Sequence, residues 1–204
     1  MWVCNIVYGG VQVLAVCFMF AGVNVCFLTD SMCRGIERYA TDAKCWVHPG
    51  TTLERSKEQH VYHLRKVHGD TLVIIHIGTN NVASGVSPEV VLKRMQLLVQ
   101  EFSEGFQHKL YFAVCAILPR AVDDVVRGIV KFCNVLIERW CGEMENMLFL
   151  RTWKAFVRKR KVLCDMYSRD GLHLSWEGKM RLFAHFRHFV WRFCKATVQL
   201  PNVK

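Results

Sequence analysis

Apolar runs alternate with amphipathic segments along most of the chain. The clearest run, TLVIIHI at 71–77, is apolar on both faces, a pattern typical of a strand buried inside a parallel sheet. Shorter or more interrupted runs predict four further strands, at 23–28, 45–47, 109–118 and 147–150.

Helical spacing of apolar residues fills the intervals between these runs. Ser87 precedes Pro88 and an acidic first turn, which predicts a helix that begins with a serine N-cap. Other helices are expected over 31–40, 53–68 and 125–141 and from Trp176 onward. The last has one apolar face made by Trp176, Met180, Phe183, Phe186, Val190 and Phe193.

This alternation predicts an α/β fold, a three-layer α/β/α sandwich with a central parallel sheet of about five strands. Ligands of such sheets bind beyond the carboxyl ends of the strands. Turn-forming clusters follow three of the expected strands, at 29–31, 48–52 and 78–81, and a fourth, DGLH at 170–173, precedes the last helix. We expect these four loops to meet at one edge of the sheet.

The chain divides into one domain at 23–195, a tail at 196–204 and an apolar segment at 1–22. No charged residue occurs before Asp30, so the segment could be a membrane anchor or signal. Gln12 and Gly22 interrupt the apolar run. The segment could equally be an extra buried or oligomer-forming element, or read-through from upstream sequence.

Charge and cysteine content narrow the class of protein only slightly. The 27 Lys and Arg exceed the 17 Asp and Glu, and the net charge of +10 favours an anionic partner such as nucleic acid, a lipid surface or an acidic substrate. The ten cysteines contain no Cys-x-x-Cys pair, which argues against a zinc cluster. Cys26, Cys115 and Cys194 lie in apolar runs and are expected to be reduced core residues, favouring an intracellular, cytoplasmic location over a membrane-anchored or secreted one.

Three polar positions in the loops could carry chemistry. Ser31 could present its hydroxyl at the start of a helix, or Asp30 or Ser31 could merely cap that helix. Asp170 and His173 have the spacing that lets a carboxylate orient an imidazole, or they could form a structural turn. Asn80 could donate to an oxyanion or close its loop.

The order of these motifs resembles the SGNH, or GDSL, hydrolase family. Four stretches match the four conserved sequence blocks of that family, namely LTDS at 28–31, PGTT at 49–52, IGTNN at 77–81 and DGLH at 170–173. Four longer stretches are also similar in sequence to the SGNH-like domains of LINE-type retroelement proteins and related animal genes, namely FLTDSM, VIIHIGTNN, AILPR and DGLHLSWEGK.

This resemblance implies a flavodoxin-like fold and a serine esterase that hydrolyses small acyl esters without a metal or cofactor. Ser31 would be the nucleophile, His173 the base and Asp170 the residue that orients the base. The Ser31 and Gly50 amides and the Asn80 side chain would form the oxyanion hole.

Two positions depart from the family pattern. Thr29 replaces the glycine usual before Asp-Ser, where a side chain could conflict with an unusual backbone angle. Asn81 replaces the acid that commonly follows the motif asparagine, which could loosen the loop presenting Asn80.

A basic segment, RTWKAFVRKRK at 151–161, precedes the Asp/His loop. Trp153 or Phe156 could stack on a base, or both could be core residues beside a solvated loop. The residues that could contact nucleic-acid phosphates are Arg151, Lys154, Arg158, Lys159, Arg160 and Lys161.

Two histidine pairs have helical spacing that could bind a metal, but neither has an acid or thiol ligand set nearby. We therefore expect His60 and His63, and His185 and His188, on solvated helix faces. Three functional hypotheses remain: a serine esterase, a weak or inactive SGNH module that binds RNA or DNA, and a membrane-anchored lipid esterase that depends on the apolar N-terminus.

Overall fold

The computed structural model describes residues 3–8, 11–16, 22–104, 106–121 and 123–198. Its centre is a five-stranded sheet in the order β4-β3-β5-β6-β7, in which every neighbouring pair is parallel. The strands are β3 (Asn24–Thr29), β4 (Lys44–Val47), β5 (Thr71–His76), β6 (Leu110–Cys115) and β7 (Met147–Leu150). The predicted number and direction of strands are confirmed.

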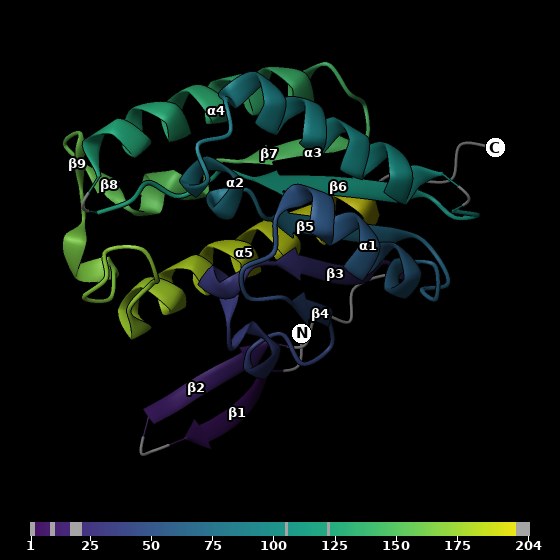
Figure 1. Cartoon of the computed structure of the whole chain (residues 1–204). Helices are drawn as coiled ribbons and strands as arrows, with labels where there is room; N and C mark the ends of the chain where they lie inside the picture. Colours follow the sequence, from purple (N-terminus) through teal and green to yellow (C-terminus); the bar gives the residue numbers. More distant parts are fainter. Residues whose placement is uncertain (1–2, 9–10, 17–21, 105, 122, 199–204) are drawn as a thin grey trace.

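Helices cover both faces of this sheet (Figure 1). One face carries α1 (Leu53–Leu64), α3 (Pro88–Ser103) and α4 (Asp124–Gly142). The other carries α5 (Trp176–Val198) and two short 3₁₀ helices, η1 (Ser31–Cys33) and η2 (Ile36–Arg38). The smaller elements are α2 (Thr79–Ala83), η3 (Thr152–Ala155), β8 (Val157–Arg158), β9 (Lys161–Val162) and η4 (Cys164–Met166).

The alternation of side chains along the strands builds two hydrophobic cores. In β3, Cys26 and Leu28 pack with α1, α3 and α4, whereas Val25 and Phe27 pack with η1, η2 and α5. Burying each large apolar side chain contributes roughly 1.5–3 kcal/mol relative to leaving it in water. A sheet that is apolar on both faces is therefore stable only between two helical layers, and the predicted α/β/α sandwich is confirmed.

One helix prediction was wrong in detail, and the predicted start of another helix was confirmed. The single helix expected over 31–40 is divided into η1 and η2, because Gly35 between them has φ 98°, which ends one helix before the next begins. Ser87 does lie at the N-cap of α3, but its side chain makes no capping hydrogen bond.

The predicted apolar face of α5 is buried at Phe183, Phe186 and Val190. Trp176 was wrongly placed there, because its side chain is 58% exposed. It lies at the first residue of the helix, beyond the end of the core, and its ring contacts that of Tyr39. The helical period of the apolar residues therefore predicted correctly which face of α5 packs on the sheet, but not at which residue that packing ends.

The N-terminal segment forms two strands in the structure. β1 (Val3–Tyr8) and β2 (Val11–Val16) pair antiparallel as a two-stranded sheet of their own. Across the described residues, no helix combines the length and apolarity needed to cross a membrane. Residues 17–21 of this segment and 199–204 of the predicted tail lie outside the described residues, and α5 continues past the expected boundary at 195 to Val198.

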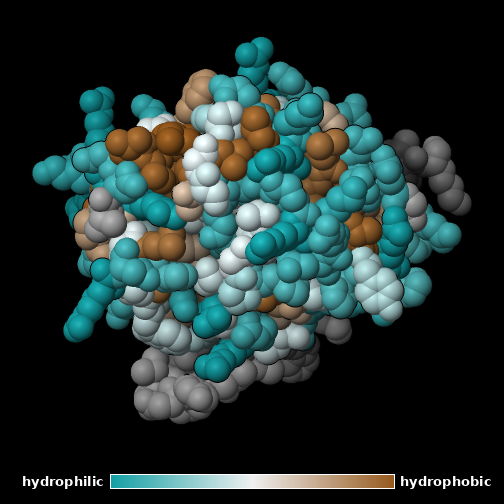
Figure 2. Space-filling view, viewed as in Figure 1, coloured by the Kyte–Doolittle hydropathy of each residue, from teal (hydrophilic) through white to brown (hydrophobic). Residues whose placement is uncertain are grey.

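Exposed apolar side chains gather on the outer surface of the α3–α4 layer. Figure 2 shows brown side chains grouped in the upper part of the view, where these helices lie in Figure 1. Leu97 of α3 and Phe132 and Val135 of α4 are each about half exposed. The candidate site described below lies elsewhere, at the carboxyl ends of the strands.

Candidate active site

The strand order creates a crevice at one edge of the sheet. The chain passes from β3 outward to β4 and then returns to β5 on the opposite side of β3. The loops after β3 and β5 therefore diverge, and such a switch point is where ligands of open α/β sheets bind. Ser31 follows β3 and Asn80 follows β5, so strand order brings these two loops together.

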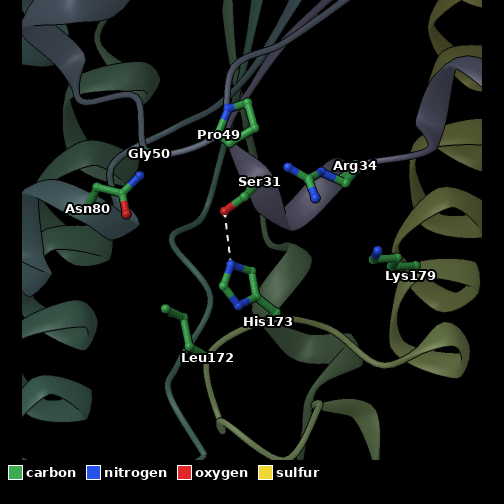
Figure 3. Close-up of a pocket in the computed structure, with 8 residues that line it drawn as sticks. All are labelled: Ser31, Arg34, Pro49, Gly50, Asn80, Leu172, His173 and Lys179. Carbon is green, nitrogen blue, oxygen red and sulfur yellow. Dashed lines mark hydrogen bonds between the residues drawn. The ribbon is translucent and has the colours of Figure 1, made fainter.

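Local capping presents the Ser31 hydroxyl to this crevice. Asp30 is the N-cap of η1, and its Oδ1 accepts a hydrogen bond of 3.0 Å from the Met32 backbone N–H. Ser31 is thus free of the capping role, and its Oγ lies 3.2 Å from Nε2 of His173 (Figure 3). Both sequence interpretations hold: Asp30 caps the helix and Ser31 faces the histidine.

The DGLH loop holds an Asp–His pair in hydrogen-bonding geometry. Asp170 Oδ2 lies 2.6 Å from His173 Nδ1, and Oδ1 accepts from the Leu172 and His173 backbone N–H groups at 2.9 Å each. The hydrogen bond with His173 lowers the pKa of Asp170 to about 2, and the Leu172 amide contributes in the same direction. The ionised carboxylate favours the tautomer with Nδ1–H, which leaves Nε2 as the acceptor that faces Ser31.

Gly50 and Asn80 lie in the same cavity as Ser31 and His173. The cavity has a volume of about 500 Å³, and Arg34, Pro49, Gly50, Asn80, Leu172 and Lys179 line it with these two residues. Asn80 Nδ2 donates to the Thr51 carbonyl at 2.8 Å, which orients the amide and leaves its second hydrogen available. Polar N–H groups beside a serine nucleophile are the donors that stabilise an oxyanion.

Thr29 does not strain the turn before Ser31. It is a buried residue of β3 with a β-strand partner on each side, Val47 and His76. No residue before Lys159 other than glycine has a positive φ within the described part of the chain. A β-branched residue suits this extended backbone, so the concern about replacing glycine is not supported.

Asn81 fastens the Asn80 loop rather than loosening it. Its Oδ1 accepts from the Leu53 backbone N–H at 3.0 Å, and its Nδ2 donates to Glu54 Oε2 at 2.8 Å. These bonds join α2 to the first turn of α1, and Glu54 is also ion-paired with Arg94. The amide therefore performs a bridging task that an acid at 81 could not perform beside Glu54.

A buried polar pair next to Ser31 was not anticipated from the sequence. Asp30 and His76 are almost fully buried, with Oδ1 and Nδ1 4.0 Å apart. Burial raises the pKa of Asp30 to about 7 and lowers the pKa of His76 to about 4, so His76 is neutral at pH 7 and the two do not form a strong ion pair. The histidine inside the apolar run VIIHI was the available signal.

Among the described residues, no group of three or more His, Cys, Asp or Glu side chains is placed to hold a metal ion.

The prediction that His60 lies on a solvated helix face was wrong. Its side chain is buried, and the centroid of its ring lies 4.7 Å from that of His48. Burial lowers the pKa of His60 to about 3, with smaller contributions from His48 and His63. His63 and His188 are exposed, as predicted, and His185 is half-buried.

The cysteine prediction is confirmed within the described part of the chain. Cys26, Cys115 and Cys194 are free and buried in the two cores. Burial raises the pKa of Cys26 to about 12, so the thiol stays protonated at neutral pH.

The basic segment contains η3 and most of the small β8–β9 hairpin. Phe156 is fully buried, so the idea that it stacks on a base is wrong, while Trp153 is half-buried against the core. Arg151 is ion-paired with Glu138. Lys154 and the four residues around the β8–β9 turn, Arg158 to Lys161, are exposed.

Comparison with known proteins identifies the family and the fold. The model of the GDSL-like lipase/acylhydrolase family matches residues 33–181. That range includes Asn80, Asp170 and His173 but begins two residues after Ser31, so the position of Ser31 rests on the geometry above. No curated protein matches the chain by sequence.

Several solved structures share the fold at low sequence identity. A member of the lipolytic G-D-S-L family from Veillonella parvula has a TM-score of 0.70 and 14% identity, over 84% of this chain and 100% of that one. A GDSL-like lipase from Bacteroides thetaiotaomicron has a TM-score of 0.65 and 20% identity, over 83% of this chain and 88% of that one. A carbohydrate esterase family 3 protein from Talaromyces cellulolyticus has a TM-score of 0.67 and 14% identity, over 85% of this chain and 99% of that one. These likenesses establish the fold.

Proposed function

Because the chain belongs to the GDSL-like lipase/acylhydrolase family, and is thus an SGNH-type ester hydrolase, we propose that it cleaves small acyl esters with a Ser31–His173–Asp170 triad. The observation that carries this proposal is the chain of contacts from Ser31 Oγ to His173 Nε2 and from His173 Nδ1 to Asp170 Oδ2. A hydroxyl becomes a competent nucleophile at neutral pH when such an oriented base accepts its proton.

The reaction begins when Ser31 Oγ attacks the ester carbonyl carbon and its proton passes to His173 Nε2. Asp170 stabilises the resulting imidazolium through its bond to Nδ1. As the tetrahedral intermediate collapses, Nε2 returns the proton to the departing alcohol and an acyl–Ser31 ester remains. Water then repeats the sequence with the same base and releases the acid and free Ser31.

The negative charge that develops on the carbonyl oxygen requires donors that are in place beforehand. We assign this role to the Ser31 and Gly50 backbone N–H groups and to the Asn80 side-chain amide, which line the cavity together. Gly50 has φ 72°, a backbone conformation that glycine adopts without strain. Loss of one such donor typically lowers kcat by about two to three orders of magnitude.

Replacement of the nucleophile tests the proposal. Ser31→Ala should lower turnover of 4-nitrophenyl acetate by about three orders of magnitude or more, and should abolish labelling of the protein by a fluorophosphonate. Ser103→Ala is the matched control, because Ser103 ends α3 and its hydroxyl donates to Val99 outside the cavity. Mass spectrometry locates the label. A folded wild-type protein that neither turns over esters nor takes the label contradicts the proposal.

Nucleic-acid binding is a second candidate function, favoured by the β8–β9 hairpin. The turn exposes Arg158, Lys159, Arg160 and Lys161, and Lys159 and Arg160 have φ 48° and 65°. No ion pair within the described part of the chain involves any of these four cations. Adjacent unpaired cations suit a phosphate backbone. Nucleic-acid binding would fit a retroelement-derived protein, and the resemblance of the motifs to such proteins stays a prediction.

A further inference from the structure

Two cations share the cavity with the nucleophile. Arg34 is the C-cap residue of η1, three positions after Ser31, and Lys179 is the fourth residue of α5. Figure 3 shows both on the side of Ser31 opposite to Gly50 and Asn80, with their charged ends directed into the cavity. Segments distant in sequence thus contribute two positive charges to one wall.

These charges are not neutralised by neighbouring acids. Among the described residues, neither the Arg34 nor the Lys179 side chain takes part in a hydrogen bond, ion pair or cation–π contact. None of the described residues that line the cavity is an acid. The Asp170 carboxylate, which contacts His173, is already occupied by that residue and by two backbone amides.

The position of the cations separates them from the oxyanion donors. Gly50 and Asn80 stand across the cavity from Arg34 and Lys179, so a carbonyl oxygen held by the former does not point at the latter. The cations instead face another part of a bound ester. Since the cavity of about 500 Å³ holds only a small molecule, that part lies a few atoms from the scissile bond.

On the basis of the proposed esterase function, we propose that this site selects esters that carry an anionic group, a carboxylate or a phosphate, close to the scissile bond. Arg34 and Lys179 determine this specificity by binding the anion. Charge-assisted hydrogen bonds to carboxylate or phosphate are stronger than those between neutral groups. The excess positive charge of the chain, +10, also favours the approach of such substrates.

Paired esters that differ in one charge test the proposal. In the first arm the charge lies on the acyl side, and mono-4-nitrophenyl glutarate is compared with its neutral methyl ester. In the second arm the charge lies on the alcohol side, and 4-acetoxybenzoate is compared with methyl 4-acetoxybenzoate. The kcat/KM for each ester is divided by the rate of its uncatalysed hydrolysis. We expect the anionic member to be preferred by about tenfold or more in one arm, and the arm identifies which part of the ester carries the anion.

The variants Arg34→Gln and Lys179→Gln should each lower this preference about fivefold. Arg38→Gln and Lys195→Gln are matched controls, because both residues are exposed cations outside the cavity, on η2 and α5, and should leave the preference unchanged. Raising the salt concentration from about 0.05 to about 0.5 M should reduce the wild-type preference, since salt screens partly exposed charges.

The outcomes separate this inference from the proposed function. If turnover depends on Ser31 but neither pair of esters shows a preference for the anionic member, the specificity inference is overturned and the esterase proposal stands. The same conclusion follows if the Arg34 and Lys179 variants retain the preference. Absence of Ser31-dependent turnover of all four esters overturns the esterase proposal and the specificity with it.

Discussion

Asn81 shows how a single side chain can replace a family residue through a different network. Its amide both accepts from the α1 backbone and donates to Glu54, which an aspartate could not do. The bond that fixes Asn80 to Thr51 lies beside this bridge. The position of Asn80, the proposed oxyanion donor, therefore depends on residues that do not line the cavity.

Asn81→Asp should lower the free energy of unfolding by about 1–2 kcal/mol, because a buried carboxyl would then face Glu54 without a donor between them. Adding Glu54→Gln restores a donor and should recover part of the loss. Urea denaturation of the single and double variants measures both values. Equal stability of wild type and Asn81→Asp would contradict the bridging role.

The buried Asp30 carboxyl makes stability depend on pH. Burial raises its pKa from 3.8 to about 7, so between these values the folded state holds a proton that the unfolded chain has released. This contribution to stability is present at low pH and is lost as pH rises through 7. His76, whose pKa is lowered from 6.5 to about 4, acts in the opposite direction between those values. His173 and Cys33 are the other titratable groups that interact with Asp30.

Asp30→Asn removes the first contribution and keeps an oxygen to accept from Met32. The variant should therefore become more stable relative to wild type as pH rises from about 5 to about 8. Guanidinium denaturation at the two pH values measures the change. A stability difference between variant and wild type that is the same at both would show that Asp30 does not titrate in this window.

At the scale of elements, the packing at the start of α5 helps to hold the loop that brings His173 to Ser31. Ser175 precedes the helix, its hydroxyl accepts from the Gly178 N–H at 3.1 Å, and its own N–H donates to the Met166 carbonyl at 3.0 Å. η4 and the first turn of α5 are therefore packed directly against each other around the DGLH loop.

Gly178→Ala should disrupt this contact, because the new Cβ would lie 2.0 Å from the Met166 carbonyl oxygen. We expect a loss of about 2 kcal/mol or more in stability and a fall in esterase activity, since the displaced segment carries His173. Gly128→Ala in the interior of α4 is the control: its Cβ meets nothing within 4 Å, and alanine should stabilise the helix by about 0.5–1 kcal/mol. Thermal denaturation that ranks the two variants equally would contradict this account.

At the scale of the whole molecule, two groups of cations lie in different places and have different proposed tasks. Arg34 and Lys179 line the cavity, whereas Arg158 to Lys161 project from the β8–β9 hairpin. The chain could thus combine ester hydrolysis with nucleic-acid binding on separate surfaces, and the two functions can be tested independently.

Replacing Arg158, Lys159, Arg160 and Lys161 by glutamine should weaken filter binding of single-stranded RNA. The slope of log K against log salt should become shallower by about 0.7 for each phosphate that these side chains no longer neutralise. The control makes the same change in net charge at exposed cations elsewhere, namely Arg55, Lys93, Lys131 and Arg187. Ester turnover should be retained in both. Identical RNA affinity of the hairpin variant and wild type would reject the hairpin as a binding surface.

The sequence by itself determined the five strands of the central sheet, the longer helices and their order, because hydrophobic period is a local property that a short window contains. It also identified the chemistry of Ser31, Asp170 and His173, since residue type sets which atoms can accept or donate a proton. The family resemblance added their roles before any contact between them was known.

Only the tertiary structure decided which of these residues meet. Ser31 and His173 are 142 positions apart, and their contact depends on strand order and on how the DGLH loop packs, which no local window specifies. The same holds for the burial of His60 and Phe156, and for the presence of Arg34 and Lys179 in one cavity. Burial and proximity are set by all the elements that surround a residue, so they are known only when the layers are assembled.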